Sequence, residues 1–234
     1  MKKILKTTLL LAFMGCAVSC SNDDDTPNTG GDGDGMQNIQ ATYLVTFTPN
    51  FTDTAFPDDY PSNPMFSGMV LAVHGEDKAI FQPGTLASDA LRVFAEEGES
   101  SDLVSDLRMS GDEDSVDFLV STYPQSEGPT TAQSVTVTID PDHTAISFVS
   151  SLLPSPDWFV GINTVSMIES TNSLYDELTV NVVAYDAGTD SGTTYDSSDM
   201  PTTPQDPIRL IESAPLGGGV GAVIGTLRFE RNDL

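Results

Sequence analysis

The stretch "ATYLVTFTP", residues 41–49, places large side chains at every second position, namely Tyr43, Val45 and Phe47. Successive side chains of a β-strand point to opposite faces of the sheet, so these three residues share one face. A helical segment would instead repeat its apolar residues every three or four positions. The stretch therefore predicts a β-strand with one buried face.

Short segments of the same kind recur along the rest of the chain, and Pro, Gly, Asn and Asp fill the intervals, as turns require. They are the segments 67–74, 115–120, 134–139, 144–152, 177–185, 208–212 and 223–230. One region differs, because Ser88 can cap a helix that has apolar residues at helical spacing and ends at Gly98. A second short helical turn is expected at 101–109. The pattern predicts a single all-β domain, an antiparallel β-sandwich with a short helical insertion.

The first nineteen residues are expected to be a signal peptide. Three lysines precede an apolar run, 9–14, which is too short to span a bilayer as a helix. The segment ends in "AVSC", 17–20, which resembles the lipobox of bacterial lipoproteins, with cleavage before Cys20 and lipid added to its sulfur. The alternative is an ordinary cleaved signal peptide. Several acyl chains on Cys20 would anchor the protein stably to a membrane.

An acidic, flexible tether is predicted at 20–38, because this segment is rich in Gly, Asp and Asn and has few apolar residues. Its acidic cluster "SNDDD", 21–25, resembles the signal that sends some lipoproteins to the outer face of the bacterial outer membrane. The whole chain has a net charge of −26, and removal of 1–19 takes away three lysines and leaves −29. This charge argues against nucleic acid as a partner, which needs a basic patch.

A cluster of acids lies in "AYDAGTDSGTTYDS", 184–197, which contains no lysine or arginine. Upstream, "PSPDWFVGI", 154–162, places Asp157 after two prolines and beside the only tryptophan of the chain. Carboxylates without basic neighbours suit a hard, oxygen-seeking cation better than zinc, which favours His and Cys. From the residues alone, a simple solvated loop and a metal-binding loop remain open.

The motifs "LLPSPDWFVGI", 152–162, and "YDAGTDSG", 185–192, strongly resemble the spondin N-terminal domain family. Further matches occur in the same order along the chain. They are "YLVTF" at 43–47, "FPDDYPSNPMFSGMVLAVH" at 56–74, "PGTLASDALRVFAEEG" at 83–98 and "PIRLIES" at 207–213. The resemblance covers nearly all of the expected domain, 39–234.

The resemblance implies a β-sandwich similar to C2 domains that holds a Ca²⁺ ion between loops at one end. It carries the metal ligands onto Asp157, Asp186 and Asp190. Backbone carbonyls or water would supply the remaining ligands, since calcium takes six to eight oxygens. The chain lacks the thrombospondin-type repeats of animal members, so the resemblance does not carry over their matrix partners.

The function expected from this reading is a non-catalytic binding or adhesion module, anchored by lipid and exposed on the surface of the outer membrane. Its ligand would be an extracellular protein or a glycan. No nucleophile elbow is present and His74 reads as structural, so we predict no catalytic residue.

Three alternatives remain open. The calcium could serve only to stabilise a surface protein. The chain could also process glycans with Glu96 or Glu97 and an aspartate as paired carboxylates. The segment with Phe56, Tyr60 and Phe66 is either an aromatic platform for sugars or a loop packed across the end of the sandwich.

Overall fold

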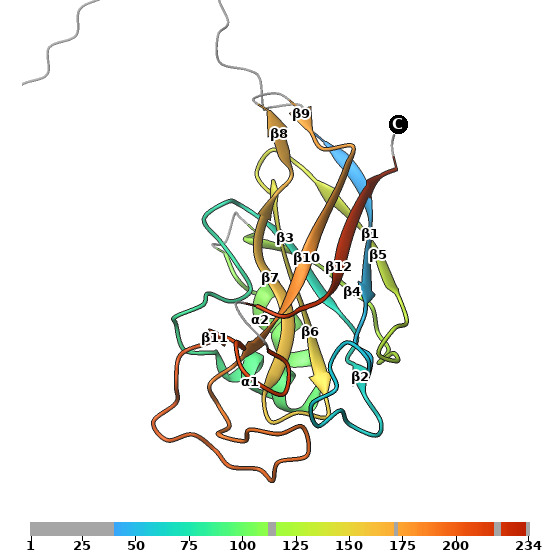
Figure 1. Cartoon of the computed structure of the whole chain (residues 1–234). Coiled ribbons are helices and arrows are strands. Elements are labelled where there is room, and N and C mark those ends of the chain that lie inside the picture. The colour runs from blue at the N-terminus through green and yellow to red at the C-terminus, as the bar shows by residue number, and fades with distance from the viewer. Residues whose placement is uncertain (1–39, 112–115, 171–172, 218–220, 233–234) are drawn as a thin grey trace, which may run out of the picture. The chain divides into compact units, whose positions relative to one another are not determined.

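The computed structural model describes residues 40–111, 116–170, 173–217 and 221–232, and within them nearly all strands belong to one antiparallel sheet (Figure 1). The strands of this sheet are β1 Ala41–Pro49, β2 Met65–Phe66, β3 Val70–His74, β4 Phe118–Thr122, β5 Gln133–Ile139, β6 Ala145–Leu153, β7 Trp158–Ser166, β10 Glu177–Asp186, β11 Arg209–Leu210 and β12 Val223–Arg231. Two short strands, β8 Ile168–Ser170 and β9 Ser173–Leu174, form a separate hairpin.

The order of the main strands is β4-β3-β6-β7-β10-β12-β1-β5, with β2 paired to β6 and β11 paired to β10. The sheet curves until its two edge strands approach each other. Ser121 of β4 donates a hydrogen bond from its hydroxyl to the carbonyl oxygen of Thr136 of β5, at 3.3 Å. The predicted all-β class is therefore confirmed, as an antiparallel and nearly closed β-sandwich-like sheet.

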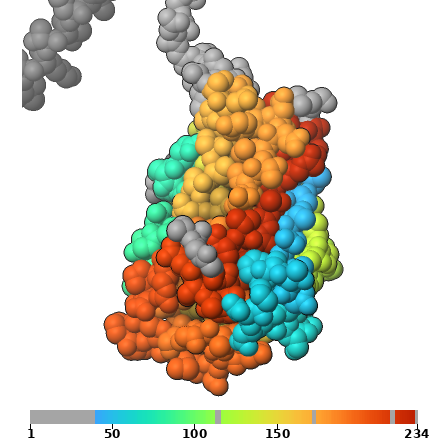
Figure 2. All heavy atoms as spheres, in the orientation of Figure 1, coloured from blue at the N-terminus to red at the C-terminus, as the bar shows by residue number. Residues whose placement is uncertain are grey.

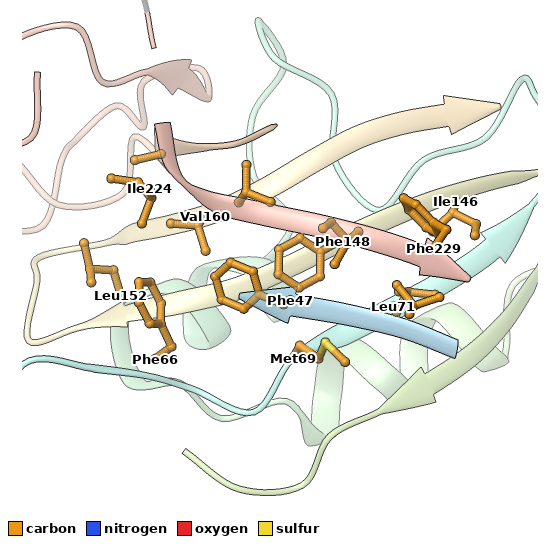
Figure 3. Close-up of a cluster of buried hydrophobic side chains, with 14 of the residues drawn as sticks. Phe47, Phe66, Met69, Leu71, Ile146, Phe148, Leu152, Val160, Ile224 and Phe229 are labelled. Carbon is orange, nitrogen blue, oxygen red and sulfur yellow. The ribbon is translucent and has the colours of Figure 1, made fainter. Parts of the chain in front are cut away.

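Apolar side chains fill the inside of this curved sheet, as the alternation in β1 predicts. Tyr43, Val45 and Phe47 are fully buried. The ring centroid of Phe47 lies 5.4 Å from that of Phe66 and 4.9 Å from that of Phe148. Figure 3 shows these three rings among the other apolar side chains of the core. Such aromatic pairs add stabilisation beyond the apolar area they bury.

Two helices, α1 Asp89–Glu97 and α2 Ser101–Arg108, cover the outer face of part of the sheet. The hydroxyl of Ser88 accepts a hydrogen bond from the backbone N–H of Leu91, as expected for an N-cap. Gly98 ends α1 with a φ of 75°, a conformation that favours glycine. The predicted helical insertion is confirmed, and α1 packs through Leu91 and Phe94 in a second apolar cluster with β6, β7 and β10.

The loop between β1 and β2 packs across one end of the sandwich. Phe56 and Phe66 are buried, and the ring of Phe51 lies 5.3 Å from that of Phe56 and 4.9 Å from that of Tyr60. The Tyr60 hydroxyl donates to the carbonyl oxygen of Phe51. The hypothesis of an exposed sugar platform is wrong, because these rings fill the end of the core.

The predicted segments and the strands of the structure differ at two places. The segment expected at 208–212 forms only the two-residue strand β11. In contrast, the apolar run after Asp157 extends into the nine-residue strand β7. The predicted signal peptide, Cys20 and the tether lie outside the described residues. No helix of the described part of the chain is long and apolar enough to cross a membrane.

Candidate metal centre

The three predicted ligands lie at one end of the sandwich. Asp157 immediately precedes β7, Asp186 is the last residue of β10, and Asp190 follows in the next loop. Strands β7 and β10 are antiparallel neighbours, and Asp186 pairs with Trp158. The fold therefore brings Asp157 close to Asp186, although they stand 29 positions apart in the sequence. The loop that contains Asp190 lies at the lower end of the molecule in Figures 1 and 2.

Asp157 is fully buried and uses its two carboxylate oxygens unequally. Its Oδ2 accepts hydrogen bonds from the backbone N–H of Thr189 at 2.6 Å and of Asp190 at 3.0 Å, and from the Thr189 hydroxyl at 3.2 Å. Its Oδ1 is buried and has no hydrogen-bond partner. Burying a polar atom without a partner costs free energy, so Oδ1 is an exception that requires an explanation.

The pKa of Asp157 is also shifted from its ordinary value. Burial, together with the nearby charge of Asp186, raises the pKa of Asp157 from 3.8 to about 6, against the effect of its hydrogen bonds from Asp190 and Thr189. The surroundings of Asp157 thus favour its protonated form, and keeping the carboxylate ionised costs free energy of folding. A cation beside Asp157 and Asp186 would remove that cost.

Asp186 is mostly buried and has a partner for each oxygen. Its Oδ1 accepts from the backbone N–H of Gly188 at 2.8 Å, and its Oδ2 accepts from the Arg209 guanidinium at 2.7 Å. Burial raises the pKa of Asp186, while the charge of Arg209 opposes the rise. The expectation that these acids have no basic neighbour is therefore wrong, because β11 brings Arg209 beside the end of β10.

Asp190 is buried and orders the outer part of its loop. Its Oδ1 accepts from the backbone N–H of Gly192 at 2.6 Å, and its Oδ2 accepts from that of Met200 at 2.7 Å. Thr202 donates from its backbone to the carbonyl oxygen of Thr189 at 2.8 Å, which closes the loop. Asp190 thus connects the two sides of the loop through backbone contacts.

Gly188 permits the close packing of this loop. Its φ is 76°, and a Cβ atom at this position would lie 2.1 Å from the carbonyl oxygen of Asp206. Among the described residues, one other buried side-chain atom has no hydrogen-bond partner, the hydroxyl oxygen of Tyr195. The ring of Tyr195 lies 5.2 Å from that of Trp158, measured between centroids. Both unpaired atoms therefore belong to the same end of the sandwich.

The residues have the chemistry that calcium requires, although the described side chains are not arranged as a complete shell. Within those residues, no three His, Cys, Asp or Glu groups lie close enough together to hold a metal ion. Asp157 nevertheless offers an unpaired Oδ1, and each oxygen of Asp186 and Asp190 has lone pairs beyond the hydrogen bonds described above. Carboxylate oxygens are the ligands that Ca²⁺ prefers.

Two clefts adjoin these residues. A small one of about 150 Å³ lies beside Trp158, Asp186 and Arg209. A second, of about 300 Å³, is lined by four carboxylates and by Ser155, Pro156 and Ser197. The four carboxylates belong to Glu96, Glu97, Asp190 and Asp199. The structure thus brings the end of α1 beside the loop of Asp190, which sequence spacing did not reveal.

His74 has a structural position, as predicted. It is fully buried, its Nδ1 lies 2.8 Å from the carbonyl oxygen of Gly75, and its Nε2 lies 2.6 Å from the Ser147 hydroxyl. Both ring nitrogens are therefore engaged with neighbouring groups of the fold.

Comparison with known proteins agrees with the sequence motifs. The family model described as Spondin_N matches residues 41–216. Spondin-2 of Rattus norvegicus is 33% identical over 177 residues, which cover 74% of this chain and 53% of that protein. Spondin-2 of Homo sapiens is 32% identical over the same shares. Spondin-1 of Xenopus laevis is 32% identical over 181 residues, or 22% of its length. The chain therefore spans about half of the Spondin-2 proteins and about a fifth of Spondin-1, and it belongs to the Spondin_N family.

Proposed function

We propose that this protein is a calcium-binding module of the cell surface that binds an extracellular partner without catalysis. The observation that carries the proposal is the buried Oδ1 of Asp157, which has no hydrogen-bond partner and belongs to a carboxylate on which the charge of Asp186 also acts. Asp157 would hold the ion through this oxygen, and Asp186 and Asp190 would hold it through their remaining lone pairs. When bound, calcium would supply the positive charge that these buried carboxylates lack.

The residues around the site determine what calcium binding would do to the protein. Asp157 already joins the start of β7 to the loop at Thr189 and Asp190 through its Oδ2. Asp190 in turn fixes Met200 on the far side of the loop. An ion held by Asp157 would therefore order the whole loop and give this end of the sandwich a defined surface for a partner.

The proposed place of action is the outer surface of a bacterial outer membrane, with Cys20 as the lipid-modified anchor and 20–38 as the tether. The proposed ligand is an extracellular protein or a glycan, and the net charge of −26 makes nucleic acid an unsuitable one.

Thermal unfolding in chelator and across a calcium titration tests the calcium site. A ligand that binds only the folded state stabilises it by about 2.7 kcal/mol at a hundred times its dissociation constant. For a domain of this length, the midpoint should rise by roughly 5–11 °C. The rise should be absent in Asp186→Asn and Asp190→Asn. A wild-type midpoint that does not respond to calcium, in protein shown by elemental analysis to contain none, would contradict the proposal.

Screening of soluble glycans and extracellular matrix proteins against the immobilised protein separates binding from mere stabilisation. The binding module predicts at least one ligand that is retained in calcium and released by chelator. A purely structural role for calcium predicts the thermal shift without any calcium-dependent ligand.

A glycan-processing enzyme is a second candidate, supported by the cleft that Glu96, Glu97, Asp190 and Asp199 line. Paired carboxylates in a cleft are the groups that glycoside hydrolysis needs. This function predicts release of reducing sugar from a glycan substrate, abolished by Glu96→Gln or Glu97→Gln. Glu96 also pairs with Arg92 at 2.8 Å, so Arg92→Gln is the control for structural loss.

A further inference from the structure

Arg209 lies between two carboxylates, one of which belongs to the proposed calcium site. Its Nη2 is 2.7 Å from Oδ2 of Asp186, and its Nη1 is 3.6 Å from Oδ2 of Asp206. The Asp186 side chain is 10% exposed, whereas the Asp206 side chain is 59% exposed. Arg209 therefore pairs with one buried acid and one solvated acid at the same time.

The backbone of β11 is fixed, while the Arg209 side chain has room to move. Ile208 donates from its backbone to the carbonyl oxygen of Thr85 at 2.8 Å, and Ile211 donates to that of Ala184 at 3.1 Å. The side chain of Arg209 is 55% exposed and lines the small cleft beside Trp158. Release of Asp186, with Asp206 kept as the partner, thus requires only a rotation of the Arg209 side chain.

Arg209 supplies positive charge to a site that contains buried carboxylates. Asp157 and Asp186 are two mostly buried carboxylates, and the charge of Asp186 acts on Asp157. Of these two acids, Arg209 pairs only with Asp186. The guanidinium supplies one positive charge and leaves Oδ1 of Asp157 unpaired. A divalent cation would supply more charge to both acids, but it would have to share Asp186 with a like-charged group.

We propose that Arg209 is an internal competitor for the calcium site. In the absence of a cation its guanidinium bridges Asp186 and Asp206, and Asp206 alone holds it when the site is filled. Arg209 is thus a positioning residue that weakens calcium affinity and keeps the acidic loop folded without metal. This inference rests on the proposed calcium site.

Isothermal titration of the purified protein with calcium tests the role of Arg209. In Arg209→Gln, calcium should bind about tenfold more tightly, because one positive charge close to a divalent ion is removed. Arg209→Lys, which keeps the charge, should stay within about twofold of wild type. The matched control is Arg228→Gln, which removes the same charge from β12, where Arg228 pairs with Glu177 and Glu230. It should also stay within about twofold, because Glu177 lies at the end of β10 opposite Asp186.

A double-mutant cycle tests the part assigned to Asp206. Asp206→Asn should weaken calcium binding in the wild-type background, because Arg209 then has no alternative partner. In the Arg209→Gln background the same change should have little effect, so the two substitutions are coupled. Additive effects would instead mean that Asp206 acts only through its own charge, and would overturn this step.

The outcomes separate this inference from the function on which it rests. If wild type and Arg209→Gln both bind no calcium, the calcium site and the competitor are both wrong. If wild type binds calcium and Arg209→Gln binds it equally or more weakly, only the competitor is wrong. Tighter binding in Arg209→Gln alone, with Arg228→Gln unchanged, is the expected result. Circular dichroism in chelator checks that each variant remains folded.

Discussion

Gln133 and Asp157 are both fully buried polar side chains, but the fold satisfies only one of them. Gln133 begins β5, where the two edge strands of the sheet approach each other. Its Oε1 accepts from the backbone N–H of Met69 at 2.9 Å, and its Nε2 donates to the carbonyl oxygen of Ser67 at 3.0 Å. Asp157 receives all its hydrogen bonds on Oδ2 and none on Oδ1.

The difference separates the structural role of Gln133 from the metal-binding role that we propose for Asp157. Buried polar groups in native proteins are nearly always hydrogen-bonded, and Gln133 follows that rule because it ties β5 to the segment before β3. Asp157 departs from that rule, because its Oδ1 has no partner, and burial also raises its pKa. The ionised Asp157 therefore lowers the stability of the metal-free protein. Such local costs are expected at functional sites.

The largest effect is expected from Gln133→Ala. The substitution leaves the backbone N–H of Met69 buried without a partner and opens a small cavity, so it should destabilise the fold by about 4 kcal/mol. Urea unfolding would measure the loss, and its size should be the same in calcium and in chelator. A loss below about 1 kcal/mol would contradict the structural role of Gln133.

The pH dependence of the metal-free protein should identify Asp157. Its folded pKa of about 6 lies above the ordinary 3.8, so the native state binds more protons between these values. Its contribution to stability is therefore greatest below pH 3.8 and falls by about 3 kcal/mol as pH rises through 6. Unfolding in chelator from pH 4 to 7 would measure the fall, which should be absent from Asp157→Asn. If stability depends on pH in the same way in the wild type and in Asp157→Asn, the fall does not originate from Asp157.

A smaller effect is expected from Gly188→Ala, for which Gly84→Ala is the matched control. Both glycines have positive φ, 76° and 89°, so alanine is strained at either position. Only at Gly188 would the new Cβ meet a backbone atom, the carbonyl oxygen of Asp206. We expect a loss of about 2–3 kcal/mol at Gly188 and about 1 kcal/mol at Gly84 in thermal unfolding. Equal losses would show that the loop relaxes without cost.

Much of the fold could be predicted from local patterns. The alternation in β1 and the capping residues of α1 determine those elements through contacts within a few positions, so their bounds agree closely with the sequence analysis. The segment 208–212 was harder to predict, because its strand consists of two residues paired only to the end of β10. The burial of Phe56 likewise depends on Phe51 and other residues across the end of the core.

The sequence motifs indicated the three acids of the candidate site but not the residues around them, and the role of the acids as metal ligands stays a prediction. Asp157, Asp186 and Asp190 were found through motifs, and the family assignment is confirmed. Arg209 was missed, because it lies 23 positions from Asp186 and no periodic signal links a two-residue strand to that loop. Its presence in "PIRLIES" was the available sign, but only the pairing of β10 with β11 shows which acid it meets.

The most direct test of the account is the number of calcium ions bound per chain, measured by equilibrium dialysis for wild type and for Asp157→Asn. Asparagine keeps an oxygen to accept from Thr189 and Asp190, and it removes the charge that the unpaired oxygen carries. The account predicts one calcium ion per wild-type chain and none per Asp157→Asn chain at the same free calcium. A wild type that binds none, or an Asp157→Asn variant that binds as much as wild type, would contradict it.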